Sequence, residues 1–128
     1  MESAYVVLGA YGGIGSALSR RLASRGHQLL LAGRDEVRLA GLAAELGAQT
    51  YVLDAINVRH VEACFKHASQ LFGGLTGVAN CVGSLLLKPA HLLSEDDWDA
   101  TLNINLKSAY ATGVGYLEMT GYARGSRP

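Results

Sequence analysis

A glycine-rich stretch near the start of this sequence has residue types and a spacing suited to binding a phosphate group. It consists of Gly9, Ala10, Tyr11, Gly12, Gly13, Ile14 and Gly15. The apolar run 4–8 before it predicts a buried strand, and the pattern over 16–23 after it predicts a helix. Such a turn points backbone N–H groups and the positive end of the helix dipole at an anion. We expect Gly9 to allow a tight turn. Gly13 and Gly15 would let a pyrophosphate and the next strand approach where a β-carbon would collide.

The spacing of these glycines is G-x-x-x-G-x-G, which differs from the dinucleotide pattern G-x-G-x-x-G. No Lys-Ser or Lys-Thr pair comes directly after the last glycine of the stretch, so a P-loop is excluded. A glycine cluster is also compatible with a flexible turn that binds nothing. The strand and helix predicted on either side favour nucleotide binding over that alternative.

Three further predicted strands end in polar or glycine residues. The apolar segments 28–32, 49–53 and 75–82 end at or near Arg34, Asp54 and the tetrapeptide 80–83, Asn-Cys-Val-Gly. Ligands of parallel sheets bind at the carboxyl ends of the strands, near the point where the strand order reverses. We therefore expect these residues and the glycine-rich stretch to line one site.

Helical patterns separate the predicted strands, with short connections between them. They cover about 16–25, 36–46 and 58–72, and a fourth begins after the N-cap residue Ser94. This alternation predicts an α/β fold, a Rossmann-like parallel sheet of order 3-2-1-4 with helices on both faces. We expect the helix over 36–46 to bury Val37, Ala40, Ala44 and the neighbouring leucines. The fourth helix should bury an apolar stripe of Trp98, Leu102, Asn105, Leu106 and Ala109.

Composition limits the possible functions. The chain has 128 residues, 49% of them hydrophobic, and a formal net charge of zero, which argues against disorder and against electrostatic binding to nucleic acid. No apolar stretch is long enough to span a membrane, and no zinc-ligand spacing occurs. The two cysteines, Cys64 and Cys81, fall in a predicted helix and a predicted strand. We interpret both as buried free thiols, which predicts a cytoplasmic protein.

The sequence resembles the short-chain dehydrogenase/reductase family over about residues 4–112. Residues 8–15 match the family pattern Thr-Gly-x-x-x-Gly-Ile-Gly, and Asp54 matches its Asp at the end of the third strand. Residues 80–83 match its Asn-Asn-Ala-Gly. Asn105-Leu106 match its Asn-Leu in the fourth helix, and Trp98 stands where the family usually has Trp. Leu8 departs from the pattern where the family has Thr, and Cys81 and Val82 stand where it has Asn and Ala. The resemblance implies a truncated NAD(P)-binding Rossmann domain over 1–112. The Gly- and Arg-rich composition of 113–128 predicts an irregular tail.

The resemblance also implies a nicotinamide dinucleotide as cofactor. The binding residues that it implies are Gly9, Tyr11, Gly12, Gly13, Ile14, Gly15, Arg34, Asp54, Ala55, Asn80, Val82 and Gly83. Rossmann sites use an acid near the end of the second strand for a ribose 2′-hydroxyl and an Arg for a 2′-phosphate. Gly33 and Arg34 therefore favour NADP(H) over NAD(H). The alternatives are a surface Arg34 paired with Asp35 or Glu36, and a ribose held by Asp35.

Other site residues each have a structural alternative. Asp54 is implied to receive the adenine amino group. It is also placed to cap the helix beginning near residue 58, although Asn57 is the better-placed cap. Asn80 and Gly83 are implied to border the adenine ribose and the nicotinamide side of the site. Their alternative is a strand end followed by a turn glycine.

Asn105 is the one candidate catalytic residue, because the family's Asn holds main chain and a water of the proton relay. The family's catalytic Ser and its Tyr-x-x-x-Lys lie beyond the fourth helix, and no Tyr here is followed four residues later by Lys. An amide that bridges the helix to a strand is therefore the favoured role of Asn105. Lys107 and Tyr110 are expected to face solvent or a partner.

We therefore expect the NADP(H)-binding portion of a short-chain oxidoreductase, inactive by itself. The alternative is a non-catalytic nucleotide-sensing or interaction module. The open edge of the fourth strand and the fourth helix predict a homo-oligomer, or pairing with a chain that supplies the missing catalytic residues. An early stop or shifted reading frame after about Thr112 would explain both the tail and the missing half.

Overall fold

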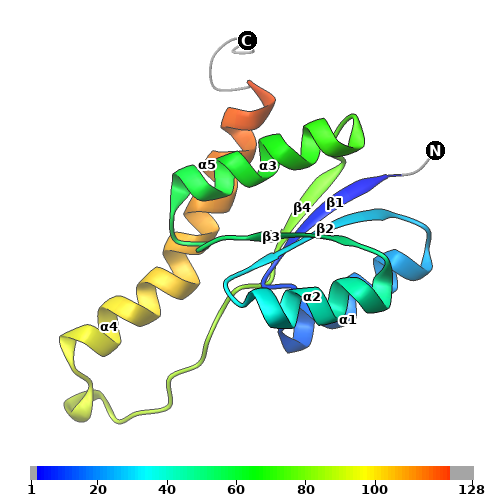
Figure 1. The fold of residues 1–128 in the computed structure, drawn as a ribbon. Coiled ribbons are helices and arrows are strands. Elements are labelled where there is room, and N and C mark those ends of the chain that lie inside the picture. Colours follow the sequence, from blue (N-terminus) through cyan, green and yellow to red (C-terminus); the bar gives the residue numbers. More distant parts are fainter. Residues whose placement is uncertain (1–2, 122–128) are drawn as a thin grey trace.

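The computed structural model describes residues 3–121 and shows a parallel sheet with helices on both faces (Figure 1). The elements are β1 (Ala4–Leu8), α1 (Gly13–Ser24), β2 (Gln28–Gly33), α2 (Glu36–Leu46), β3 (Gln49–Val52), α3 (Val58–Phe72), β4 (Gly77–Asn80), a 3-10 turn (Ala90–Leu92), α4 (Glu95–Leu102), a π-helical turn (Asn103–Lys107) and α5 (Ser108–Thr120). β4 is shorter than the predicted 75–82, so Cys81 lies just beyond the strand. None of the helices in this range has the length and apolar character needed to cross a bilayer.

The strand order is β3-β2-β1-β4 and every pairing is parallel, which confirms the predicted topology. In the register of the sheet, Leu8 of β1 lies between Ala32 of β2 and Asn80 of β4. The carboxyl ends of these three strands therefore lie side by side. The chain order reverses between β1 and β4, which is the position expected for a ligand.

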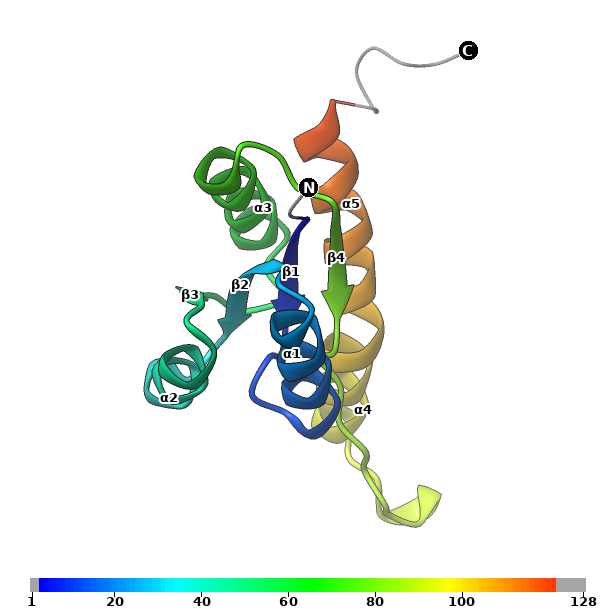
Figure 2. The same cartoon turned by 90° about the vertical axis from the view of Figure 1, so that its right-hand side faces the viewer.

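Strand residues alternate between two hydrophobic cores. Val7 and Leu31 belong to the core under α1 and α2, whereas Val6 and Leu30 belong to the core under α3 and α5. The two pairs of helices accordingly lie on opposite faces of the sheet (Figure 2). Phe65 of α3 is among the largest fully buried side chains, at the centre of the second core.

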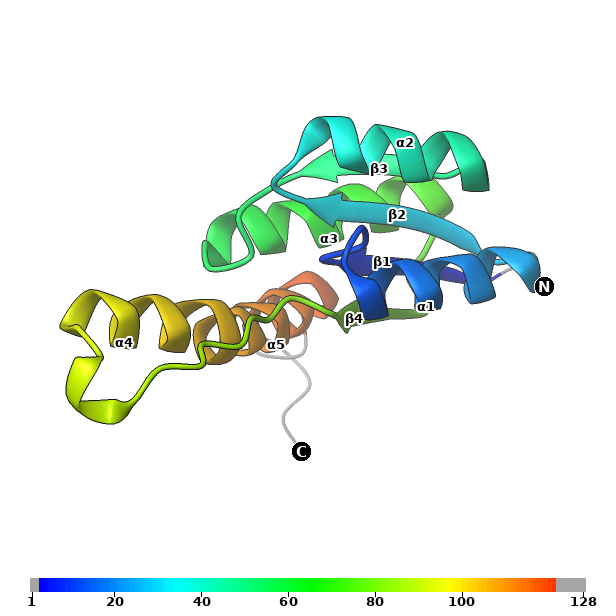
Figure 3. The same cartoon turned by 90° about the horizontal axis from the view of Figure 1, so that it is seen from below.

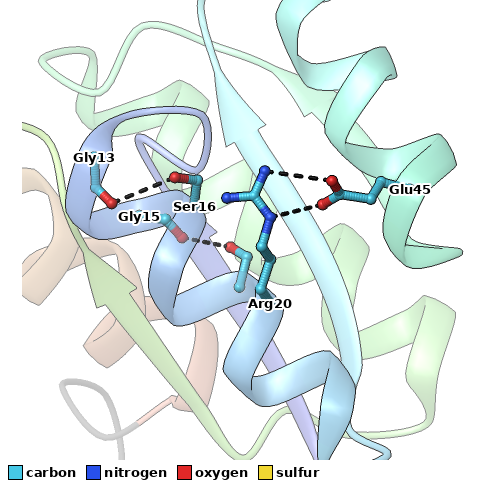
Figure 4. Close-up of polar contacts among 6 residues, drawn as sticks. Gly13, Gly15, Ser16, Arg20 and Glu45 are labelled. Atoms are coloured by element: carbon cyan, nitrogen blue, oxygen red, sulfur yellow. Dashed lines mark hydrogen bonds and ion pairs between the residues drawn. The ribbon is translucent and has the colours of Figure 1, made fainter.

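Helix α2 has the predicted boundaries, and its predicted buried face is confirmed only for the leucines, of which Leu39 and Leu42 are buried. Its buried residues are Leu39, Leu42 and Ala43. The expectation that Val37, Ala40 and Ala44 face the core is wrong, because all three are exposed. On the exposed side, Glu45 accepts a hydrogen bond from Arg20 Nε at 2.8 Å, and Figure 4 shows this ion pair joining α1 to α2.

Helices α4 and α5 form one long helix through the π-helical turn. Ser94 caps α4 as predicted, in a capping box with Asp97. α4 and the segment before it project away from the sheet (Figures 1 and 3). The stripe expected to enter the core does not do so, because Trp98 and Leu106 are 57% and 64% exposed. Within residues 3–121 these two side chains are left uncovered, and they mark an unpartnered face of the long helix.

The prediction of an irregular tail from residue 113 is wrong as far as residue 120, since α5 continues to Thr120. Gly113 and Gly115 lower the intrinsic helix propensity of this segment. Gly115, however, is buried against α3, where an added β-carbon would lie 3.2 Å from Val61 Cγ1. Packing against α3 thus outweighs local propensity. The rest of the predicted tail, 122–128, lies outside the described residues.

Candidate functional site

A cleft of about 650 Å³ lies at the carboxyl ends of the strands. The strands, the loops after them and one face of α4 supply its walls. Its lining residues are Gly9, Tyr11, Gly12, Gly33, Arg34, Leu53, Asp54, Ala55, Ile56, Cys81, Val82, Gly83, Ser84, Leu85, Leu86, Asp97, Ala100, Thr101, Asn103 and Ile104. Eight of the twelve cofactor-binding residues predicted from the sequence are among them. The four outside the lining are Gly13, Ile14, Gly15 and Asn80.

The glycine-rich stretch forms a tight turn between β1 and α1. Gly9 has a φ of 71°, and a β-carbon there would lie 3.0 Å from backbone atoms of Cys81 and Val82. A β-carbon on Gly15 would lie 2.1 Å from the carbonyl oxygen of Gly9. Both positions therefore exclude a larger side chain, because the atoms that it would meet belong to the backbone and cannot rotate away.

The N-cap residue Gly12 lines the cleft, and the first turn of α1 begins directly after it at Gly13. Gly12 is the N-cap and has no side chain to accept hydrogen bonds from this turn. Gly13 has no atom within 4 Å of an added β-carbon, and Ile14 is 78% exposed. An uncapped helix N-terminus in a glycine turn suits a phosphate.

Two serines stabilise this turn from inside α1. The buried Ser19 hydroxyl donates to the carbonyl oxygen of Gly15 at 2.7 Å. The Ser16 hydroxyl donates to the carbonyl oxygen of Gly13 at 3.3 Å (Figure 4). Both serine hydroxyls donate to carbonyl oxygens, so neither of them occupies an N–H group of the first turn.

Arg34 is exposed and is the one basic residue among the lining residues. It forms no ion pair within the described part of the chain, so the alternative of pairing with Asp35 or Glu36 has no support there. Asp35 does not line the cleft. Its Oδ1 accepts hydrogen bonds from the N–H groups of Val37 and Arg38, both at 3.1 Å, and so caps α2.

Tyr11 connects the glycine turn to the end of β2. Its hydroxyl oxygen accepts hydrogen bonds from the N–H groups of Arg34 at 3.2 Å and Asp35 at 3.1 Å. The Arg38 guanidinium lies 4.5 Å from the centre of the ring. A β-carbon on Gly33 would lie 2.7 Å from Tyr11 Cε1. The sequence placed Tyr11 in the site but gave no sign of these contacts.

Asp54 lines the cleft and does not cap α3. Its Oδ1 accepts a hydrogen bond from the N–H of Ile56 at 3.2 Å. Asn57 caps α3 by accepting from the N–H of His60 at 3.1 Å, as its position in the sequence suggested. Ala55 is buried beside Asp54 and also lines the cleft.

Asn80 holds the end of β4 in place. Its Oδ1 accepts from the N–H of Val82 at 3.0 Å, and its Nδ2 donates to the Ser108 hydroxyl at 3.3 Å. The buried Ser108 donates in turn to the carbonyl oxygen of Ile104 at 2.6 Å. Asn80 thus ties the strand to α5, while Val82 and Gly83 form the wall of the cleft.

Asn105 bridges the long helix to the segment after β4. Its Oδ1 accepts from the N–H of Ser84 at 3.1 Å, and its Nδ2 donates to the carbonyl oxygens of Ser84 and Thr101, both at 3.0 Å. These contacts match the bridging role predicted for the amide, with a loop in place of a strand. Asn105 is exposed and outside the lining, and Lys107 and Tyr110 are exposed as expected.

The wall supplied by α4 was not predicted. Asp97, Ala100 and Thr101 of α4 and Ile104 of the π-helical turn line the cleft at helical spacing, opposite the exposed apolar stripe. That helical spacing is the signal in the sequence that could have indicated a second face of the helix. The hydrogen bond from Lys88, together with those from Ser94, lowers the pKa of Asp97.

Metal-ligand clusters and the two thiols are the remaining groups that could do chemistry. Within residues 3–121 no cluster of His, Cys, Asp and Glu is suited to a metal ion. Cys81 lines the cleft as a half-buried thiol, where burial raises its pKa. Cys64 is fully buried in the core, where burial raises its pKa to about 12. In both thiols the raised pKa disfavours the thiolate, which is the nucleophilic form of cysteine.

Comparison with known proteins adds a family to this geometry. A family profile described as short chain dehydrogenase matches residues 3–125. An uncharacterized oxidoreductase of Staphylococcus aureus (strain USA300) is 34% identical over 115 residues, which are 88% of this chain and 50% of that protein. The chain spans about half the length of the curated relatives it matches.

Solved structures agree with the fold. A short-chain dehydrogenase/reductase from Brucella melitensis is 29% identical, with a TM-score of 0.86 over 93% of this chain and 54% of that one. A variant of actinorhodin polyketide ketoreductase, solved with NADPH, has a TM-score of 0.88 at 23% identity, over 95% of this chain and 49% of that one. The second likeness concerns the fold alone.

Proposed function

Since the chain belongs to the short chain dehydrogenase family, we propose that it is the NADP(H)-binding portion of an oxidoreductase of this kind. The observation that best supports the proposal is the glycine turn. A β-carbon at Gly15 would meet the backbone 2.1 Å away, and an uncapped helix N-terminus follows directly. A turn that merely connected two elements would not need backbones packed this closely beside a free helix end.

The residues present fit a nicotinamide dinucleotide. Gly12 and the first turn of α1 would hold the pyrophosphate, Asp54 and Ala55 the adenine end, and Val82 and Gly83 the inner wall. When bound, the cofactor supplies hydride transfer to or from a carbonyl or alcohol carbon. The protein orients it and excludes water from one side. The oxidoreductase name of the Staphylococcus aureus relative agrees with this chemistry.

The preference for NADP(H) over NAD(H) rests on the end of β2. Arg34 offers a planar guanidinium to a 2′-phosphate, and no ion pair within residues 3–121 competes for it. Gly33 leaves no acid where one would repel that phosphate. Asp35 uses its carboxylate to cap α2, which weakens its case as a ligand of the ribose.

We propose further that this chain by itself does not turn over a carbonyl substrate. None of its tyrosines has a lysine four residues later, and Asn105 is engaged with Ser84 and Thr101. Because proton transfer needs an acid or base within reach of the substrate, binding alone is not enough for the reaction.

A titration of the chain with NADPH, followed by cofactor fluorescence, tests the proposal, with NADH measured alongside. Saturable binding with a lower dissociation constant for NADPH is expected. Binding of neither cofactor would overturn the proposal. The same samples, mixed with carbonyl substrates, test for turnover at rates ordinary for enzymes, which we do not expect.

A second candidate function is an interaction module, supported by the unpartnered face of the long helix. Trp98, Leu102, Leu106, Tyr110 and Leu117 are all exposed along one side of it. β4 pairs with one neighbour among the described strands, so its other edge is open to a further strand. We propose that a second copy of the chain, or a chain that supplies Tyr-x-x-x-Lys, covers this face and edge.

The two candidate functions differ in what accompanies the chain. A complementing chain with Tyr-x-x-x-Lys would make the complex an enzyme. Self-association without such a chain, together with saturable NADPH binding, favours a nucleotide-binding module. We also propose a cytoplasmic location, because Cys64 and Cys81 are free thiols.

A further inference from the structure

Tyr11 is the residue of the glycine turn whose side chain leaves the turn and reaches β2. Its hydroxyl oxygen accepts both N–H groups that follow Gly33, those of Arg34 and Asp35. These donors lie where the chain leaves the sheet to begin α2, at the edge of the cleft. A ligand anion cannot use them directly while the phenol oxygen occupies them.

The phenol has one further hydrogen-bonding capacity, its own proton. No acceptor for that proton is found within residues 3–121. Two N–H groups that donate to the oxygen polarise the O–H bond and make it a stronger donor. The Arg34 backbone nitrogen is 3.2 Å from this oxygen, so the hydroxyl lies beside the residue that supplies the cleft's basic side chain.

Packing holds the ring in this position. The three atoms nearest to a β-carbon on Gly33 would all belong to Tyr11, at 2.7, 3.3 and 3.4 Å. The Arg38 guanidinium lies over the ring at 4.5 Å. Tyr11 lines both the main cleft and a second cavity whose lining includes Arg20 and Arg38. The hydroxyl is therefore fixed, which lowers the entropic cost of using it as a donor.

We propose that Tyr11 is a specificity-determining residue, whose hydroxyl donates to the 2′-phosphate of the dinucleotide beside Arg34. The inference rests on the proposed function, since it assigns a residue to one end of the same ligand. A donor to a phosphate dianion contributes more than a donor to a neutral ribose hydroxyl. Tyr11 should therefore change the ratio of NADPH to NADH affinity, and not dinucleotide affinity as a whole.

The test compares the dissociation constants of NADPH and NADH for wild type, Tyr11→Phe and Gly33→Ala. Tyr11→Phe keeps the ring and removes the hydroxyl, which is the proposed donor to the phosphate and the acceptor for the N–H groups of Arg34 and Asp35. We expect the dissociation constant for NADPH to rise ~10-fold and that for NADH to change less than ~2-fold. Gly33→Ala keeps the Tyr11 hydroxyl but displaces the ring. It should therefore also lower the ratio of NADPH affinity to NADH affinity.

The double variant Tyr11→Phe/Gly33→Ala should have the same ratio as Tyr11→Phe, because both changes act through one hydroxyl. Tyr5→Phe, near the amino end of β1 and outside the lining of the cleft, is the matched control, and thermal melting checks that each variant is folded. An unchanged ratio in Tyr11→Phe, or an equal loss for both cofactors, overturns the inference and leaves the proposed function standing. Failure of the wild type to bind either cofactor overturns both.

Discussion

The backbone of Gly15 lies against the carbonyl oxygen of Gly9, so closely that a β-carbon on Gly15 would be 2.1 Å from that oxygen. The same β-carbon would be 3.0 Å from the Ala10 α-carbon. Gly15 lies in α1 with ordinary helical geometry, and it has no positive φ. Glycine is therefore required here by close approach of the turn to the helix, and not by backbone conformation.

Gly15→Ala is expected to disrupt the turn and remove dinucleotide binding. All the nearest atoms are backbone atoms that cannot rotate away, so the turn must shift. Overpacking of this kind typically lowers the free energy of unfolding by about 1–3 kcal/mol. Urea denaturation gives that free energy, and the cofactor titration gives the binding.

Gly41→Ala is the matched control for this change. Gly41 is exposed in the interior of α2, with no atom within 4 Å of an added β-carbon. Replacing it should stabilise the protein by about 0.5–1 kcal/mol, because alanine has the higher helix propensity. Equal stability of Gly15→Ala and wild type would show that the turn adapts without cost.

Arg34→Ala is expected to weaken NADPH binding ~10- to 100-fold, since charge-assisted hydrogen bonds to a phosphate contribute about 1.5–3 kcal/mol. NADH lacks that phosphate, so its dissociation constant should change little. Fluorescence titrations with both cofactors give the ratio. Arg59→Ala, which removes an exposed charge from α3, controls for a change in net charge. A loss that is the same for both cofactors would rule out the assignment of Arg34 to the 2′-phosphate.

The sheet and its order followed from the sequence because each strand is an apolar run with a helix-like pattern after it. Helix termini were predictable for the same local reason, since Asn57 and Ser94 cap their own helices. Which face of a helix is buried was harder to predict from the sequence. Val37 was assigned to the core of α2 and is 81% exposed, because a short apolar helix offers more than one possible stripe.

Most residues of the candidate site could also be predicted, because the carboxyl ends of the strands lie side by side in any parallel sheet. What the sequence did not give depends on contacts between distant residues. The bond from the Arg34 N–H to Tyr11 spans 23 positions, and that from Ser84 to Asn105 spans 21. The helical path of 113–120 likewise depends on Gly115 packing against α3.

Asn105→Ala should loosen the segment between β4 and α4 without unfolding the sheet. Three hydrogen bonds link the Asn105 amide to Ser84 and Thr101. Losing these hydrogen bonds should lower the free energy of local opening by about 1–2 kcal/mol. Thermolysin should therefore cleave the chain within residues 83–93 ~10-fold faster than in the wild type. Asp99→Ala, an exposed change on the same helix, is the control. Cleavage of Asn105→Ala at the wild-type rate would argue against this bridging role.

Cys64 should make the protein less stable at alkaline pH. Burial raises the pKa of this thiol to about 12 in the folded state, whereas in the unfolded chain it is near 8.5. Between these two values the unfolded state loses the proton and the folded state keeps it. The free energy of unfolding therefore falls as the pH rises, by about 1 kcal/mol per pH unit from this group.

Chemical denaturation at pH 7, 9 and 10.5 compares wild type with Cys64→Ala. The variant should be the less stable protein at neutral pH, because it leaves a small cavity in the core. Its stability should decline less steeply than that of the wild type above pH 9. Cys81→Ala, which removes a half-buried thiol, should reduce the slope less. Parallel declines in wild type and Cys64→Ala would contradict the assignment.

Leu106→Glu should convert a dimer of this chain to a monomer. Leu106 is 64% exposed in the isolated chain and lies between Leu102 and Tyr110 on the unpartnered face of the long helix. A carboxylate buried in an apolar interface without a partner is strongly unfavourable. Sedimentation equilibrium over a range of protein concentrations gives the association constant. Val37→Glu introduces the same charge at an exposed position on the opposite face of the sheet, and should leave the dimer intact. A wild type that stays monomeric at high micromolar concentration would exclude self-association through this face.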